Sequence, residues 1–172
     1  MKYLYPSLLI ASLITSIAFS ATPKKSVMAW PPAGKTNHVA VDKFSTSPDL
    51  EVTLWAKSPQ FYNPTNMSID PLGRIWITEG VNYREKLGIR RNAGDRIMVL
   101  IDSDNDGTAD QSKVFLQDPY LESPLGISVF DNQIIISQPP DIVIYTDVNR
   151  DLKFDPKIDK KEILLTGFNG QI

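Results

Sequence analysis

The sequence of 172 residues contains no cysteine and only one histidine, His38. These absences exclude disulfide bonds, thiol nucleophiles, iron–sulfur clusters, covalent haem attachment and structural zinc sites from this chain. Neither sign of charge dominates, because 18 lysine and arginine residues stand against 20 aspartate and glutamate residues. With no basic cluster beyond one loop to neutralise a phosphate backbone, the composition argues against nucleic-acid binding.

The first twenty residues have the pattern of a secretory signal peptide. Lys2 supplies a positive start, an apolar stretch follows over residues 4–19, and Ala18 and Ser20 are the small residues of a cleavage site. The stretch is shorter than the ~20 residues that a membrane-spanning helix needs. We therefore expect cleavage before Ala21 and export to the periplasm, the extracellular space or the cell surface. Residues 21–44 are proline-rich, lack a sustained period and are predicted to be a leader or linker.

The rest of the chain, residues 45–172, shows the two-residue alternation of short β-strands and lacks helical periodicity. Apolar residues alternate over residues 50–54, 75–77, 97–101, 114–116, 127–129, 142–144 and 163–165. Turn residues separate these segments, since residues 70–73 suit a type I turn and Asp131-Asn132 suits a tight hairpin. The sequence therefore predicts an all-β chain.

Two similar halves, about 63–117 and 123–166, repeat the same order of elements. Asp102 of the first half corresponds to Asp147 of the second, 45 residues later. Four strands in about 40–45 residues are typical of a β-propeller blade, and a ring needs at least about four blades. The prediction is a partial β-propeller of two four-stranded blades, the N-terminal part of a longer protein that supplies the remaining blades. The alternative is a small β-sandwich in which the repeats pack face to face.

An acidic loop in the first half has the spacing of a calcium-binding loop. Carboxylates at alternate positions can surround a hard cation, and Gly107 permits the sharp turn between them. The predicted ligands are Asp102, Asp104, Asp106, Thr108 through its carbonyl, and Asp110. The loop resembles those of EF-hand, dockerin and thrombospondin repeats, although Lys113 stands where an EF-hand has glutamate and strands flank it. A solvated acidic turn is the alternative.

The second half carries a weaker copy of this loop. The corresponding positions are Asp147, Asn149, Asp151 and Asp155. Leu152 replaces the glycine, and Arg150 and Lys153 dilute the negative charge. We expect this copy to keep the turn rather than to hold calcium.

Loop parity assigns the acidic loops and the substrate pocket to opposite faces. In a four-stranded meander, loops between third and fourth strands lie on one face, while second-to-third loops and links between blades lie on the other. Both acidic loops are of the first kind, so their calcium would be structural. Long polar loops around a propeller channel commonly meet substrates. The candidates on that substrate face are Glu79, Asn82, Tyr83, Arg84 and Gln138.

The order of several short motifs resembles one known family. These motifs occupy residues 71–79, 95–97, 102–110, 124–127, 139–142 and 165–168. They closely resemble the start of the exported "membrane-bound dehydrogenase" β-propeller proteins, which look like relatives of the soluble quinoprotein glucose and sorbosone dehydrogenases. The resemblance implies a six-bladed propeller that oxidises a sugar or alcohol with pyrroloquinoline quinone (PQQ) and passes electrons to a downstream c-type haem domain.

The same resemblance places the general base and the quinone ligands in later blades, so no catalytic residue is assigned to this chain. Two functions remain open at this point. The first is an exported quinoprotein-like dehydrogenase. The second is a non-catalytic, calcium-stabilised propeller that binds glycans or proteins at the cell surface.

Overall fold

The structure, a computed structural model, describes residues 40–83 and 91–168. The predicted signal peptide, His38 and Arg84 lie outside the described residues. The helical residues in the described part of the chain belong to 3-10 turns, which are η1 (Val41–Lys43) and residues 82–83. Within those same residues, no helix has the length and apolar character needed to cross a membrane.

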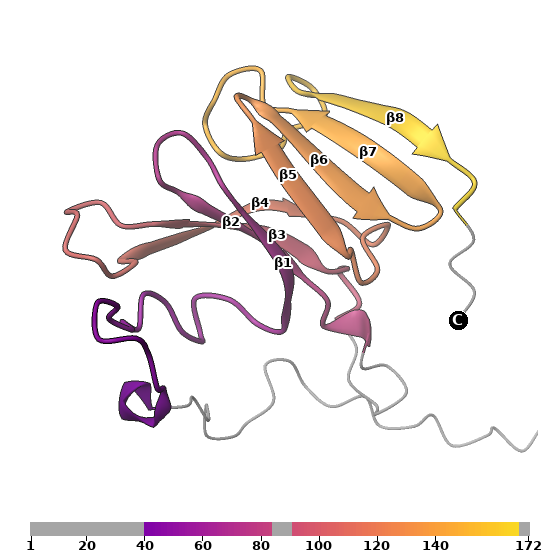
Figure 1. The fold of residues 1–172 in the computed structure, drawn as a ribbon. Coiled ribbons are helices and arrows are strands. Elements are labelled where there is room, and N and C mark those ends of the chain that lie inside the picture. The colour runs from indigo at the N-terminus through magenta and orange to yellow at the C-terminus, as the bar shows by residue number, and fades with distance from the viewer. Residues whose placement is uncertain (1–39, 84–90, 169–172) are drawn as a thin grey trace, which may run out of the picture.

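Within the described residues, eight strands form two four-stranded antiparallel sheets in which each strand pairs with its neighbour in sequence (Figure 1). The first sheet contains β1 (Pro64–Ile69), β2 (Ile75–Glu79), β3 (Arg96–Ile101) and β4 (Gln111–Gln117). The second contains β5 (Gly126–Phe130), β6 (Gln133–Gln138), β7 (Asp141–Thr146) and β8 (Lys160–Thr166). The all-β prediction and the two four-stranded repeats are thereby confirmed.

The two sheets repeat each other in register. Corresponding cross-strand pairs are Trp76–Val99 and Thr78–Ile97 in the first sheet, and Ile135–Ile144 and Ser137–Ile142 in the second. The ladder between the third and fourth strands is irregular at the same place in both sheets, between Ile97 and Met98 and between Ile142 and Val143. Each of these residues in β3 lies 45 positions before its counterpart in β7.

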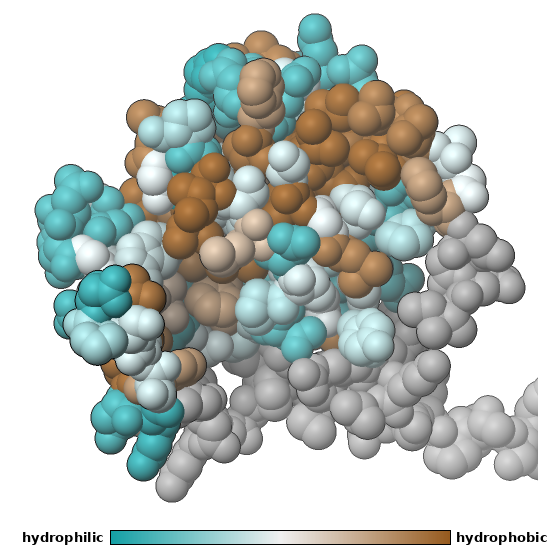
Figure 2. Space-filling view, viewed as in Figure 1, coloured by the Kyte–Doolittle hydropathy of each residue, from teal (hydrophilic) through white to brown (hydrophobic). Residues whose placement is uncertain are grey.

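The larger hydrophobic core lies between the two sheets. The first sheet contributes Trp76, Ile97, Val99, Phe115 and Leu116, and the second contributes Ile134, Ile136, Val143 and Tyr145. The rings of Trp76 and Phe115 meet edge to face with their centroids 5.1 Å apart, an arrangement that adds about 0.5–1.5 kcal/mol beyond area burial. Hydrophobic side chains also remain at the surface over β6 to β8 (Figure 2).

A second, smaller core covers the other face of the first sheet. Ile77, Met98 and Leu100 of that sheet pack against Trp55, Ala56 and Phe61. The strand predicted over residues 50–54 is therefore wrong, because residues 51–57 have no β-structure. A strand needs a neighbouring backbone to pair with. Instead of a strand ladder, the segment receives one backbone hydrogen bond from the acidic loop, in which the Ala109 N–H donates to the Trp55 carbonyl at 2.8 Å.

Candidate functional site

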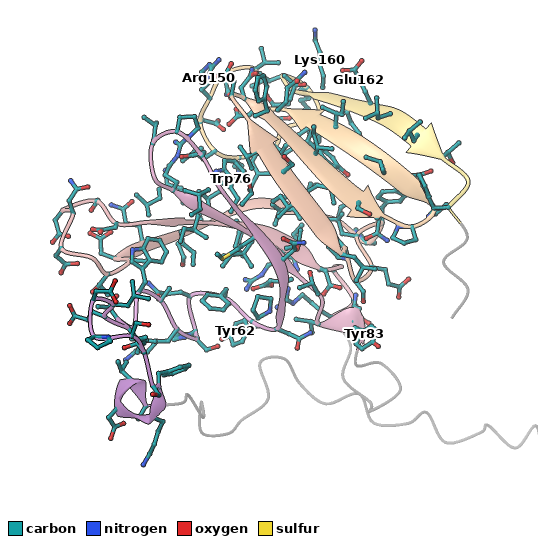
Figure 3. All side chains as sticks on the ribbon, in the orientation of Figure 1. Tyr62, Trp76, Tyr83, Arg150, Lys160 and Glu162 are labelled. Atoms are coloured by element: carbon teal, nitrogen blue, oxygen red, sulfur yellow. The ribbon has the colours of Figure 1, made fainter. Side chains whose placement is uncertain are left out.

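The loops gather at two opposite ends of the sheets, as an antiparallel meander requires. One end holds the β1–β2 and β5–β6 turns and the acidic loops 102–110 and 147–159. The other end holds residues 80–83 and 91–95, the turn at Pro139-Pro140 and the link 118–125 between the sheets. Figure 3 shows Tyr62 and Tyr83 at the second end, Arg150 at the first, and Trp76 between them.

The first acidic loop folds around the carboxylate of Asp102. Its oxygens accept the backbone N–H groups of Asp106, at 3.2 Å, and of Gly107, at 2.9 Å. Gly107 has a φ of 87°, which suits glycine because a Cβ is disfavoured there. Asp102, Asp104 and Asp106 each offer a carboxylate oxygen, and these oxygens lie within 4.8 Å of one another. Such a group can hold a divalent cation, since hard cations prefer carboxylate oxygens.

The remaining predicted ligands of this loop lie differently. The Asp110 carboxylate accepts hydrogen bonds from the Ser103 hydroxyl and, at 3.3 Å, from the Ser103 backbone N–H. Thr108 donates its backbone N–H to Asp106 at 2.8 Å and lines a cavity of about 250 Å³ beside residues 54–60. The structure therefore brings three of the five predicted ligands together.

The second acidic loop forms the same turn but has different side chains at the positions that correspond to the predicted ligands. Asp147 accepts the backbone N–H groups of Asp151, at 3.2 Å, and of Leu152, at 3.0 Å, as Asp102 does in the first loop. The Asn149 side-chain amide donates to Asp151 at 2.9 Å, so a neutral amide bonds to a carboxylate. The fourth predicted position, Asp155, accepts the backbone N–H of Lys157 at 2.9 Å.

Leu152 explains how the second loop forms without glycine. Its φ is 66°, a conformation that costs a residue with a side chain roughly 1–2 kcal/mol. The side chain is only 8% exposed and belongs to the core between the sheets. Burying a leucine side chain gains about 1.5–3 kcal/mol, which offsets the backbone cost.

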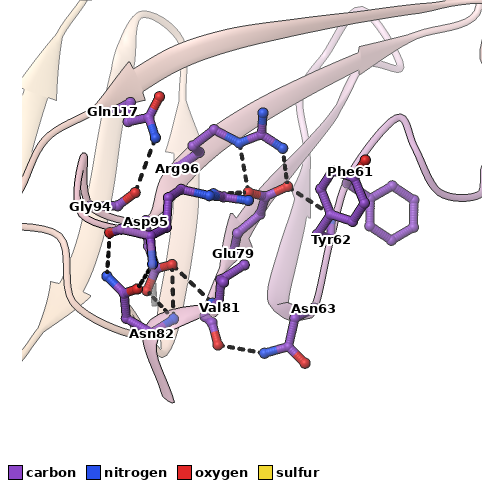
Figure 4. A network of polar contacts seen from close by, with 12 residues as sticks. Phe61, Tyr62, Asn63, Glu79, Val81, Asn82, Gly94, Asp95, Arg96 and Gln117 are labelled. Atoms are coloured by element: carbon purple, nitrogen blue, oxygen red, sulfur yellow. Dashed lines mark hydrogen bonds and ion pairs between the residues drawn. The ribbon is translucent and has the colours of Figure 1, made fainter. Parts of the chain in front are cut away.

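At the other end, Glu79 is the centre of a buried ion-pair network (Figure 4). One carboxylate oxygen accepts from Arg91 Nη1 at 2.6 Å and from Arg96 Nε at 2.7 Å. The other accepts from Arg96 Nη2 and from the Tyr62 backbone N–H, both at 2.7 Å. The network thus ties β2 and β3 to the segment that precedes β1.

Asp95 joins the β2–β3 loop to the link between the sheets. Its buried carboxylate accepts the backbone N–H groups of Val81 at 2.9 Å, Asn82 at 3.2 Å and Ser123 at 2.7 Å. Burial raises the pKa of Asp95, although these hydrogen bonds and Arg91 act in the opposite direction. Sequence reasoning missed this role, because an aspartate beside a strand gives no sign of which distant N–H groups it will meet.

The side chains of Asn82 and Gln138 also form hydrogen bonds to backbone groups within the chain. Asn82 bonds both backbone groups of Arg91, accepting from its N–H at 2.7 Å and donating to its carbonyl at 3.2 Å. Gln138 does the same with Glu122, at 3.2 and 3.0 Å. Of the predicted substrate-face residues, Glu79, Asn82 and Gln138 are thus buried, whereas Tyr83 is 69% exposed.

Comparison with known proteins assigns the chain to a family. Residues 36–171 match the family model described as a domain of unknown function (DUF7133). Because this match covers most of the sequence, the chain belongs to that family. Among curated proteins there is no significant match.

One solved structure that the chain resembles is the "Iodide structure of Trichoderma reesei Carbohydrate-Active Enzymes Family AA12". The two are 17% identical, with a TM-score of 0.44, over 62% of this chain and 24% of the other. The chain thus spans about a quarter of that protein's length.

Proposed function

We propose that this chain forms the first two blades of a six-bladed β-propeller in an exported quinoprotein-like dehydrogenase that oxidises a sugar or an alcohol. The observation that carries the propeller is the repeat itself, because two four-stranded meanders share register, bulge and acidic loop. The dehydrogenase part rests on the motif order described above.

In this proposal the chain shapes one side of the substrate face and supplies no catalytic group. PQQ, when bound, would accept the electrons removed from the substrate. The buried side chains of Glu79, Asn82 and Gln138 do not fit the role of quinone ligands, because their polar atoms already bond within the chain. We derive no step through PQQ here. A c-type haem would likewise belong to another part of the full-length protein, since this chain contains no cysteine.

The acidic loop is proposed to hold a structural calcium ion. Asp102, Asp104 and Asp106 would provide its carboxylate ligands, and their mutual proximity favours a cation between them. The loop lies at the end of the sheets away from Glu79 and Tyr83, so calcium would stabilise the blade rather than contact the substrate.

Calcium titration monitored by thermal unfolding tests this part of the proposal. At a hundredfold excess over the dissociation constant, one bound ion adds about 2.7 kcal/mol to the free energy of unfolding. Asp104→Asn combined with Asp106→Asn should abolish the shift in melting temperature. Asp151→Asn in the second loop is the matched control and should leave the shift intact. An equal shift in the double variant would show that calcium does not bind at this loop.

The alternative, a non-catalytic calcium-stabilised propeller that binds glycans or proteins, is favoured by one observation. Three of the polar side chains predicted to meet a substrate are engaged in internal hydrogen bonds. The complete protein loaded with PQQ should reduce an artificial electron acceptor when given sugars or alcohols. Glycan binding without any PQQ-dependent reduction would favour the alternative instead.

A further inference from the structure

We propose that the outer face of the second sheet is the docking surface for a third four-stranded sheet of the same repeat. This open face comprises Ile135, Ser137, Ile142, Ile144 and Leu165, whose side chains lie on one side because they pair across β6, β7 and β8. The inference deepens the proposed function and rests on it for the identity of the occupant.

The internal repeat provides a reference for how this face looks when covered. In the first sheet the corresponding residues are Trp76, Thr78, Ile97, Val99 and Leu116. All five are buried, with Ile97 and Val99 at 0% exposure, because the second sheet packs on them. In the second sheet none of the five is buried, and Leu165 is 52% exposed.

The open face is also part of a larger apolar surface (Figure 2). Leu164, at 53% exposure, corresponds to the core residue Phe115 of the first sheet and extends this surface along β8. Large contiguous apolar patches on soluble proteins mark interaction sites. In β6 and β7, moreover, apolar side chains lie on both faces of the sheet, which is expected of a sheet that is covered on both sides.

The face that covers the first sheet shows what chemistry the occupant needs. It consists of Ile134, Ile136, Val143 and Tyr145 of the second sheet. The corresponding face of the first sheet consists of Ile75, Ile77, Met98 and Leu100, and Trp55, Ala56 and Phe61 already cover it. A second copy of this chain could therefore offer a matching face only after its own residues 55–61 had detached. A following sheet without such a cover fits directly.

The path of the chain after β8 agrees with this occupant. The Phe168 N–H donates to the Pro140 carbonyl at 3.0 Å. This hydrogen bond holds the backbone at the end of the molecule where the link 118–125 joins the first sheet to the second. A third sheet connected in the same way would begin at this same end of the molecule, as the second sheet does after the link 118–125.

Cysteine accessibility tests the proposal, because the chain has no cysteine of its own. Val99→Cys and Ile144→Cys occupy equivalent positions, one beneath the second sheet and one on the open face. Each is made in the 172-residue chain and in the protein expressed from the complete natural reading frame, and the rate of thiol modification is measured. We expect Ile144→Cys to react at least about tenfold faster than Val99→Cys in the 172-residue chain and equally slowly in the complete protein.

Three outcomes would overturn the inference. The first is fast modification of Ile144→Cys in the complete protein, and the second is a reading frame that encodes no further sheet. The third is slow modification of Ile144→Cys in the 172-residue chain that becomes slower as the protein concentration rises, because this would indicate that a second copy covers the face. If Val99→Cys fails to fold, Ser68→Cys and Ser128→Cys provide a second pair, because serine and cysteine have nearly the same shape. Ser68 accepts a hydrogen bond from the Val129 N–H of the second sheet, whereas Ser128 lies exposed on the open face. The rates depend on neither calcium nor redox activity, so they can support the docking surface even where the dehydrogenase proposal fails.

Discussion

Replacing Glu79 by glutamine should destabilise the protein strongly while changing the shape of the side chain little. The carboxylate is fully buried and accepts four hydrogen bonds, three of them from the guanidinium groups of Arg91 and Arg96. Glutamine removes the negative charge and directs an amide N–H₂ toward donors. Breaking a buried ion pair by neutralising one partner costs about 3–5 kcal/mol. This is a large part of a typical stability of about 5–15 kcal/mol.

Urea unfolding followed by tryptophan fluorescence measures the effect, since Trp76 lies in the core between the sheets. With a denaturant slope of about 2 kcal/mol/M, a loss of 4 kcal/mol lowers the unfolding midpoint by about 2 M. Asp131→Asn is the matched control, because Asp131 and Arg150 form a two-bond pair at 2.8 and 2.6 Å with both side chains more than half exposed. Solvent screens that pair, so its midpoint should not move measurably.

The comparison isolates burial, because the two ion pairs have similar distances. If Glu79→Gln and Asp131→Asn shifted the midpoint equally, the argument that desolvation makes Glu79 indispensable would be refuted. Repeating the measurement in 1 M salt adds a second check. The effect of Glu79→Gln should persist there, because buried charges are screened much less than exposed ones.

Two further predictions concern the first sheet. Gly94 and Gly107 have φ values of 86° and 87°, but a Cβ at Gly94 would lie 1.8 Å from the Asp118 carbonyl oxygen, whereas a Cβ at Gly107 would meet open space. In calcium-free urea unfolding, Gly94→Ala should lower the free energy of unfolding by more than about 4 kcal/mol, and Gly107→Ala should lower it by about 1–2 kcal/mol. Similar losses in the two variants would contradict the predicted clash at Gly94. Burial raises the pKa of Asp70, but hydrogen bonds from Trp76 and Arg74 outweigh it and hold the pKa below 3.8. Asp70 therefore stabilises the fold above pH 3.8 and loses this contribution as pH falls through its lower folded-state pKa. Asp70→Asn should lose less stability than the unmodified chain between pH 6 and pH 2, and equal losses would refute the assignment.

The candidate site shows where sequence reasoning succeeded and where it stopped. The turn after β1 was predicted from Asp70 to Gly73, and the Gly73 N–H indeed donates to the Asp70 carbonyl at 2.9 Å. Local turn chemistry of this kind depends on residues next to one another. The roles of Glu79 and Asp95 depend on partners as distant in sequence as Tyr62 and Ser123. No local pattern encodes such partners.

The sequence by itself determined the two four-stranded repeats and the order of their strands, because side-chain alternation and turn residues act over a few positions and recur after 45 residues. The additional strand that it predicted over residues 50–54 did not form. It also placed the aspartates of the first acidic loop at alternate positions. Only the tertiary structure decided which polar residues are consumed in buried hydrogen bonds, that residues 55–61 cover the first sheet without forming a strand, and that Leu152 replaces a glycine by reaching the core. These outcomes depend on burial between segments far apart in the chain, which alternation within one segment cannot specify.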